Sequence, residues 1–517
     1  MKNSRFWVII SFLLVGVAWM LLSCAKSPKI NIATKQVVFD AYPEDDITIG
    51  ISSNIHWDAK LVQNERWLYF VEDELITPNP VKGKGNGHIV LKADENTSFA
   101  ERSAIVVVLG DEVHPDTIYV FQSGSIDIFE EIEDKAFREY CLAEFDKTPK
   151  DGKISLQEAQ NANRINVAGK NISSLAGIEY FTNLKELNCS NNNIQTIKLN
   201  KNKKLLTLNC SYNPINEFEI EELTELTELI ISRTNIKAID VSNALKLERF
   251  YASSLQLTNI NLSNNTELEW LYIDVNQLEN IDLRKNTKLT FLSCTDNKLK
   301  TLDIASNKAL ERLWCNNNLL PNLDVSQNTA LQYFSCAHNS IANLDLKNLK
   351  NLEWLYCDNN QIVTLDISQN AKLTDLRCTS NSLTRLELRN NKDLQILYCS
   401  NNKITNLDVS QNIALQRLGC DLNGLTNLDL ENNPELLELY CYNNPLGTLQ
   451  LNKNTKLIDL KCYNCNLNDH IDIRNNRSLV YLQVQTNPQL AEIWVWQGFN
   501  VNSTNYKKDV SARYIVK

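Results

Sequence analysis

The sequence has few of the residues from which catalytic sites are built. Only five histidines occur in 517 residues, and none belongs to a pair with metal-ligand spacing or to a nucleophile motif. The fourteen glycines form no loop of the kind that cradles phosphate groups. These absences argue against an enzyme, and we expect no catalytic residues.

An excess of positive charge is also missing. The chain carries 52 Lys and Arg against 62 Asp and Glu, a formal net charge of −10, and the charges are dispersed along it. Proteins that bind nucleic acid usually cluster Lys and Arg on one face, and no such cluster occurs here. We therefore expect no nucleic-acid partner.

The N-terminus indicates export. Lys2 and Arg5 precede an apolar run at 6–22, and Leu-Leu-Ser-Cys follows at 21–24. A basic start and a short apolar run are typical of a signal peptide, although an uncleaved anchor helix remains an alternative. The motif ending at Cys24 resembles a bacterial lipobox, which implies cleavage before Cys24 and a lipid anchor on its sulfur. Ala25 stands where Asp would favour the inner membrane. We therefore expect a signal peptide (1–23), a lipidated tether (24–36) and an outer-membrane lipoprotein facing the periplasm or the cell surface.

A 21-residue repeat dominates the second part of the chain. Its pattern is L-x-x-L-x-C-x-x-N-x-L-x-x-L-D-x-S-x-N-x-x, the signature of a leucine-rich repeat. Fourteen repeats begin 21 residues apart and a fifteenth follows after 22, at Leu184, Leu205, Leu226, Leu247, Leu268, Leu289, Leu310, Leu331, Leu352, Leu373, Leu394, Leu415, Leu436, Leu457 and Leu479. Positions 4 and 6 face the same way on an extended strand, so both are expected to point into the core. One coil cannot bury its apolar face alone, so the turns must stack.

Two columns of side chains should run through the stack. Position 9 is usually Asn, which can satisfy buried backbone groups where the strand turns. Position 6 holds eleven of the fourteen cysteines, namely Cys189, Cys210, Cys294, Cys315, Cys336, Cys357, Cys378, Cys399, Cys420, Cys441 and Cys462. Neighbouring thiols lie close enough to bridge, but a continuous column has no natural pairing, so we expect reduced, buried thiols. This cysteine-bearing repeat resembles internalin J and related bacterial surface proteins, which implies that the cysteines serve core packing.

Residues 37–125 are expected to form an immunoglobulin-like β-sandwich. Alternating apolar runs occur at 47–51, 88–91, 104–108 and 117–121, separated by turn residues. The order of Trp57, Trp67, Gly85, Arg102 and a Gln-Ser-Gly sequence at 122–124 resembles the BACON domain. The resemblance implies carbohydrate binding, for which Trp57 and Trp67 are the rings to consider. Packing of both rings in the core, and a spacer role for the domain, remain open.

Residues 126–161 are expected to be a helical cap of the array. Apolar residues recur there at helical spacing. The segment 146–158 resembles an EF-hand calcium loop, with Asp146, Asp151 and Glu158 as the candidate ligands. The loop is one residue too long, and Pro149 and Lys150 occupy its middle. Calcium is the only cofactor that the sequence suggests. The alternative is a helical cap whose loop binds no metal.

The predicted fold is an α/β-type solenoid dominated by β structure. Leucine-rich repeats at 162–489 place parallel strands on a concave face, preceded by the sandwich and the short helical cap. A C-terminal cap at 490–517 is expected to begin with one further repeat, since Leu490, Ile493 and Val495 match positions 1, 4 and 6.

Function is expected to reside on the exposed side of the strands, where positions 3, 5 and 7 point away from the core. We call the side chains at these positions the outer strand face. Its candidate partner-binding residues are Trp270, Tyr272, Phe291, Arg312, Trp314, Tyr333, Trp354, Tyr356, Arg377 and Tyr398. Exposed aromatic residues with Arg are typical of protein-binding hot spots. We therefore expect a non-catalytic binding or adhesion protein with a protein partner; glycan binding, or a structural role in which the rings only pack on each other, is the alternative.

Overall fold

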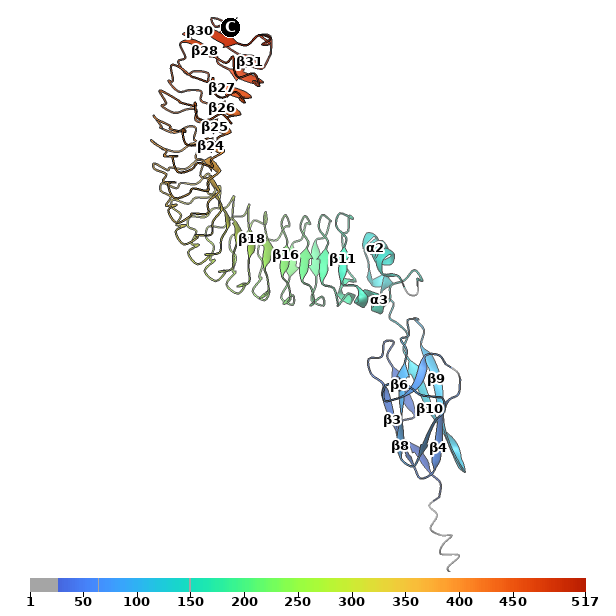
Figure 1. Ribbon diagram of the computed structural model, residues 1–517. Helices are drawn as coiled ribbons and strands as arrows, with labels where there is room; N and C mark the ends of the chain where they lie inside the picture. Colours follow the sequence, from blue (N-terminus) through green and yellow to red (C-terminus); the bar gives the residue numbers. More distant parts are fainter. Residues whose placement is uncertain (1–26, 64, 148–149) are drawn as a thin grey trace, which may run out of the picture. The chain divides into compact units, whose positions relative to one another are not determined.

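The computed structural model describes residues 27–63, 65–147 and 150–517 (Figure 1). The chain divides into two compact units, Met1–Glu131 with Arg138–Asn161, and Ile132–Phe137 with Ala162–Lys517. The expected signal peptide and Cys24 lie outside the described residues. Within the described ranges, no helix has the length and apolar character needed to cross a membrane.

The first unit contains two five-stranded sheets that share one apolar core. One sheet has the order β1 (Ile30–Ile32), β3 (Ile47–Ser53), β8 (Gly87–Ala93), β5 (Leu68–Glu72), β6 (Leu75–Ile76). The other has the order β2 (Gln36–Phe39), β10 (Val113–Gln122), β9 (Arg102–Gly110), β4 (His56–Leu61), β7 (Val81–Lys84). The four alternating runs lie in β3, β8, β9 and β10, because alternate residues of a strand face the core. In β9, Ala104, Val106 and Val108 are buried.

The sheets begin earlier than the sequence pattern indicated. Strand β1 pairs with β3 and buries Ile32, and β2 starts at Gln36. The last part of the segment expected to be a tether is therefore folded into the domain. The short β1 gave no signal because three residues are too few to show alternation.

Three short helices follow the sandwich: η1 (Phe129–Glu131), α2 (Lys135–Phe145) and α3 (Leu156–Asn161). The start of α2 belongs to the second unit, where Phe137 is buried and its ring lies 6.3 Å from that of Phe181. Asp134 accepts hydrogen bonds of 2.8 Å from the backbone N–H and the hydroxyl of Ser173. These contacts cover the apolar end of the first turn, as a capped solenoid requires.

The second unit is a solenoid whose main sheet is parallel and has 17 strands. Its first strand is β11 (Arg164–Asn166), the 3-10 helix η2 (Ile178–Tyr180) lies in the same turn, and its last strand is β31 (Tyr506–Lys507). The fifteen repeats each supply one strand between them: β12 (Glu186–Asn188), β14 (Thr207–Asn209), β16 (Glu228–Ile230), β17 (Arg249–Tyr251), β18 (Trp270–Tyr272), β19 (Phe291–Ser293), β20 (Arg312–Trp314), β21 (Tyr333–Ser335), β22 (Trp354–Tyr356), β23 (Asp375–Arg377), β24 (Ile396–Tyr398), β25 (Arg417–Gly419), β26 (Glu438–Tyr440), β27 (Asp459–Lys461) and β29 (Tyr481–Gln483). Strands β24 to β27 lie on the inner side of the curved array (Figure 1). The predicted leucine-rich-repeat solenoid is confirmed.

The Asn column at position 9 satisfies backbone groups in two adjacent repeats. Asn297 donates from Nδ2 to the carbonyl oxygens of Ile273 and Cys294, at 3.0 and 3.2 Å. Its Oδ1 accepts the backbone N–H of Leu278 at 3.1 Å. The same arrangement recurs along the stack, so each Asn joins its own turn to the preceding one. The column is interrupted at Thr234, Leu255 and Cys465, where no amide is present.

A second Asn column lies at position 19. The repeat pattern contains this Asn, but no role was predicted for it. Asn307 donates to the carbonyls of Leu283 and Asn286 at 3.0 and 2.8 Å. Members of this column are fully buried and bond in the same way, as at Asn265, Asn286, Asn328, Asn370, Asn391, Asn412, Asn433, Asn454 and Asn476. Spacing identifies such a position, but only the folded coil shows which carbonyls the amide reaches.

The C-terminal cap differs from the expected extra repeat. Strand β30 (Leu490–Val495) joins a separate three-stranded sheet with β28 (Asp469–Asp472) and β32 (Arg513–Val516). Leu490 follows Leu479 by only eleven residues, half a turn of the coil, so β30 lies opposite the main sheet. A two-stranded sheet of β13 (Thr196–Lys198) and β15 (Glu217–Glu219) occupies the same part of the first two repeats. The extra-repeat expectation was wrong, because Leu490, Ile493 and Val495 lie in this separate sheet and not in the main one.

The cysteine column lies inside the coil. All eleven position-6 cysteines are fully buried, and every cysteine in the described ranges is a free thiol. Burial raises the pKa of the Cys189 and Cys399 thiols to about 12, so these thiols are protonated at neutral pH and slow to react.

Replacing Cys336 with Ser is expected to lower the free energy of unfolding by about 1–3 kcal/mol, because a buried hydroxyl loses its hydration. Other repeats carry Ile231, Ala252 or Val484 at this position, so Cys336→Val is the matched apolar control and should cost less. Urea unfolding of both variants is the measurement. A Ser variant as stable as the native protein, beside a destabilised Val variant, would contradict apolar packing of the column.

Candidate functional site

The ten candidate residues of the outer strand face come from seven consecutive strands, β18 to β24. The parallel register places position 3 beside position 3 and position 5 beside position 5 in neighbouring repeats. Trp314 and Trp354 are the most exposed of the rings, at 37% and 44%. The flanking positions 4 and 6 are buried, so the strand backbone holds these rings on the outside.

The rings of β17 to β20 form one packed group. Tyr251 and Tyr272 are stacked with centroids 5.1 Å apart, and Tyr272 lies 4.4 Å from Phe291. The Trp270 and Phe291 ring centroids lie 5.4 Å apart, and the Trp314 ring meets Phe291 edge-on with centroids 5.0 Å apart. Phe291 is therefore enclosed and only 2% exposed. It supports the other rings and is not itself an accessible contact residue, in contrast to its expected role.

A second group combines rings with a buried charge. Tyr333 meets Trp354 edge-on at 4.8 Å, and Trp354 lies parallel to Tyr356 at 6.3 Å. The Arg377 guanidinium lies 4.4 Å from the centroid of Tyr356 and 5.6 Å from that of Tyr398. These contacts are of the cation–π type, which a partly desolvated site strengthens.

Asp375 links the members of this second group. Its carboxylate lies 3.0 Å from the Arg377 guanidinium and accepts a 2.8 Å hydrogen bond from the Tyr356 hydroxyl. Burial, together with this hydrogen bond, raises the pKa of Tyr356 to about 12. The tyrosine is therefore a hydrogen-bond donor at neutral pH, and sequence spacing offered no signal for the role of Asp375.

Polar residues at position 7 border the rings and bond across repeats. Asp274 accepts hydrogen bonds from the Ser293 hydroxyl at 2.6 Å and from the Thr295 N–H at 2.8 Å. Asn316, two repeats later, accepts the equivalent pair at 2.6 and 2.8 Å. Desolvation by burial raises the pKa of Asp274 above 3.8, since ionisation of a partly buried carboxyl is unfavourable.

Replacing Asp274 with Asn is expected to stabilise the protein at neutral pH. A raised carboxyl pKa contributes stability below the unfolded value, and that contribution is lost as pH rises through the folded value. The melting temperature of the variant should therefore exceed that of the native protein as pH rises above about 4. This difference in stability should disappear in more acidic solution. Thermal melting across this range measures it. Asn316→Asp, the reverse change, should be less stable at neutral pH; a pH-independent difference in both variants would contradict the assignment.

The three candidate calcium ligands serve local backbone groups. Asp146 accepts the N–H groups of Asp151 and Gly152, both at 3.0 Å. Glu158 accepts the N–H and hydroxyl of Ser155, at 3.0 and 2.9 Å, and the Ser155 hydroxyl accepts the N–H of Glu158 at 3.2 Å. That reciprocal pair is a capping box at the start of α3. In the part of the chain that the structure describes, no group of three or more His, Cys, Asp or Glu side chains is arranged to hold a metal ion.

The two sandwich tryptophans are core residues. Trp57 is 4% and Trp67 7% exposed. Trp57 lies over Gly83, where an added Cβ would meet its ring at 2.1 Å, and it donates from Nε1 to the Gly85 carbonyl. The Arg102 guanidinium lies 4.6 Å from the Trp67 ring centroid. Neither ring presents a face on which a sugar can stack.

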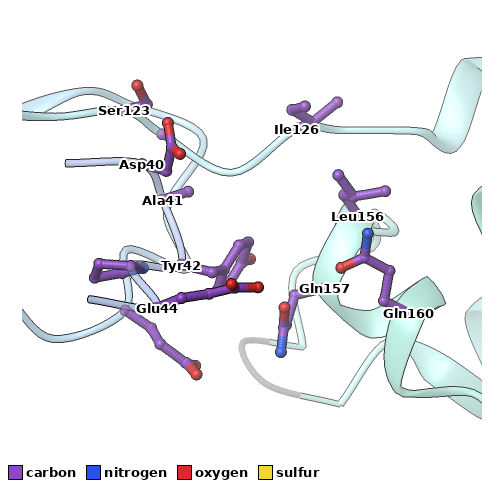
Figure 2. A pocket seen from close by; sticks show the side chains of 12 residues that line it. Asp40, Ala41, Tyr42, Glu44, Ser123, Ile126, Leu156, Gln157 and Gln160 are labelled. Carbon is purple, nitrogen blue, oxygen red and sulfur yellow. The ribbon is translucent and has the colours of Figure 1, made fainter. Parts of the chain in front are cut away.

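A pocket of about 700 Å³ lies within the first unit and includes no expected site residue. Figure 2 shows Tyr42 and Glu44 on one side of it and Gln157 and Gln160 of α3 on the other. The Tyr42 hydroxyl lies 2.8 Å from that of Ser125. Its other lining residues are Asp40, Ala41, Pro43, Glu95, Ser123, Gly124, Ile126 and Leu156. It is a mixed polar and apolar hollow beside the helical segment.

Comparison with known proteins identifies solved structures that are similar to the repeat array. No protein-family model matches the chain. A search of curated proteins gave no match either. Among solved structures, the functional domain of InlJ from Listeria monocytogenes, which includes a cysteine ladder, is 30% identical. That similarity covers 73% of this chain and 84% of that one, with a TM-score of 0.65.

Two further structures share the fold at lower identity. A leucine-rich-repeat protein of Leptospira interrogans is 20% identical, over 66% of this chain and 91% of that one, with a TM-score of 0.56. An internalin of Listeria monocytogenes (inlF) is 24% identical, over 64% and 95%, with a TM-score of 0.52. Repeat length, buried Asn and Cys columns and the InlJ similarity agree. The chain therefore belongs to the leucine-rich-repeat proteins, in the group whose repeats carry a cysteine ladder.

Proposed function

We propose that this is a non-catalytic binding or adhesion protein of the bacterial cell envelope that recognises a protein partner through the outer strand face. The observation that carries the proposal is the exposure of Trp314 and Trp354 on a sheet held rigid by buried Asn and Cys columns. Large aromatic side chains beside Arg are enriched in the centres of protein interfaces. A rigid scaffold also lowers the ordering cost of binding.

The glycan alternative receives less support from the structure. The rings that the BACON-like resemblance suggested for sugar stacking, Trp57 and Trp67, are buried. Glycan binding by the outer strand face is the alternative result of the following experiment. Capture from an envelope extract, beside a glycan array, should return a protein retained by the native chain and lost from the Trp314→Ala, Trp354→Ala double variant.

Membrane attachment is proposed to occur through lipid on Cys24. Replacing Cys24 with Ser should abolish lipid attachment, because the sulfur that carries the lipid is gone, and should leave an unprocessed or soluble form. Membrane fractionation and mass spectrometry of the N-terminus are the measurements. A wholly soluble native protein with an intact N-terminus would disprove the anchor. The outer membrane is the proposed site, with the array facing the periplasm or the cell surface.

A further inference from the structure

The outer strand face contains a three-residue arrangement that occurs twice. Tyr356 at position 5 is covered by Arg377, the position-5 residue of the next repeat, with the Arg377 guanidinium 4.4 Å from the ring centroid. Tyr440 is covered in the same way by Lys461, whose ammonium lies 3.9 Å from the centroid. In each case a cation of one repeat lies on the ring of the repeat before it.

A carboxylate at position 3 completes both arrangements. Asp375 pairs with Arg377 at 3.0 Å and accepts the Tyr356 hydroxyl at 2.8 Å. Asp459 pairs with Lys461 at 3.4 Å and accepts the Tyr440 hydroxyl at 3.0 Å. Ring, cation and carboxylate thus satisfy one another, which makes this a stable way for the face to hold a positive charge.

The position-5 rings of Trp314 and Tyr398 are each followed in the next repeat by a small residue instead of a cation. Trp314 is paired with Ser335, and Tyr398 with Gly419. A Cβ added to Gly419 would meet the Tyr398 ring at 2.5 Å, so that ring lies against the next strand. Ser335 points outward yet is only 6% exposed. Among the described residues, no cation lies over the ring of Trp314 or Trp354.

Charge around these uncovered rings is strongly unbalanced. In the five repeats that begin at Leu268 through Leu352, positions 2, 3, 5 and 7 carry five carboxylates and one cation, Arg312. The carboxylates are Glu269, Asp274, Glu311, Glu353 and Asp358. Glu353 is in direct contact with the rings, since its carboxylate accepts the Tyr333 hydroxyl at 3.1 Å. Arg312 lies over Tyr333, with its guanidinium 5.2 Å from the ring centroid. Trp314 and Trp354 therefore lie on a part of the face rich in carboxylates, without the covering cation that Tyr356 and Tyr440 have.

We propose that the partner is a basic segment of a protein whose Arg or Lys side chains cover Trp314 and Trp354, as Arg377 and Lys461 cover Tyr356 and Tyr440. This inference rests on the proposed function and names the chemistry of its partner. A guanidinium that stacks on a ring and pairs with a carboxylate uses both features of the face. Ser335 supplies no cation to the Trp314 ring of the preceding repeat, so that cation comes from the partner.

The test supplies that cation from within the chain. Ser335→Arg places Arg at the position that Arg377 occupies relative to Tyr356, and Ser335→Gln is the uncharged control of similar length. The probe is an octa-arginine peptide measured by isothermal titration calorimetry, beside octa-glutamate and a neutral cello-oligosaccharide. The native protein should bind only octa-arginine, and raised salt should weaken that binding. Ser335→Arg should weaken it at least about tenfold more than Ser335→Gln does.

The carboxylates beside the rings provide a second variant that does not depend on the Ser335 site. Glu311→Gln with Glu353→Gln should also weaken octa-arginine binding about tenfold, with thermal melting as the control for folding. The proposal is overturned if octa-arginine binds no better than octa-glutamate, if the cello-oligosaccharide binds instead, or if both charge changes leave affinity intact. A captured protein whose binding is lost in the tryptophan variants but unchanged in the charge variants would support the proposed function. It would disprove only the inference that the partner is basic.

Discussion

Replacing Asn297 with Leu is expected to lower the free energy of unfolding by about 2–4 kcal/mol. The substitution removes the acceptor of the Leu278 N–H and donors to the Ile273 and Cys294 carbonyls. A buried donor without a partner costs about 1–3 kcal/mol, and each lost bond about 1 more. Equilibrium urea unfolding is the measurement.

The interrupted part of the column provides the matched control. Thr234 occupies position 9, and its hydroxyl is buried without a hydrogen-bond partner among the described residues. Thr234→Asn should therefore stabilise the protein, while Asn297→Leu destabilises it. Equal stability of Asn297→Leu and the native chain would show that the column fills space and is not needed for hydrogen bonding.

Replacing Trp314 or Trp354 with Ala is expected to weaken partner binding at least about thirtyfold, since truncating a hot-spot ring costs about 2 kcal/mol or more. Stability should change much less than the 2–5 kcal/mol of a core Leu→Ala change. Only edge or parallel ring contacts are lost, and these contribute about 0.5–1.5 kcal/mol each. Thermal melting beside titration with the captured partner measures both effects.

An exposed ring outside the two groups is the matched control for binding. Tyr481 stands at position 3 of the last repeat and is 47% exposed. Tyr481→Ala should bind as the native protein does. If both tryptophan variants also bind at native strength, the partner does not use the outer strand face, and the pocket of the first unit becomes the next surface to examine.

The two ends of the array show where sequence patterns were insufficient. Leu490, Ile493 and Val495 have the apolar spacing of a repeat and are buried as that spacing predicts. They nevertheless lie in the sheet opposite the main one, because the coil had completed only half a turn. At the other end, β1 contributes to the sandwich through pairing with β3, a contact between residues far apart along the chain.

The order of amino acids is enough to predict the repeat register, the inward residues and the stacked Asn and Cys columns. These follow from a constant 21-residue spacing and from the need of each coil to bury its apolar face against the next. Which outward rings are accessible depends on how neighbouring repeats pack in the folded array. Phe291 and Trp314 both point outward, yet Phe291 is 2% and Trp314 37% exposed. The difference arises because contacts across neighbouring repeats depend on ring orientation and on the size of the adjacent side chain, and neither is specified by a residue's position in its own repeat.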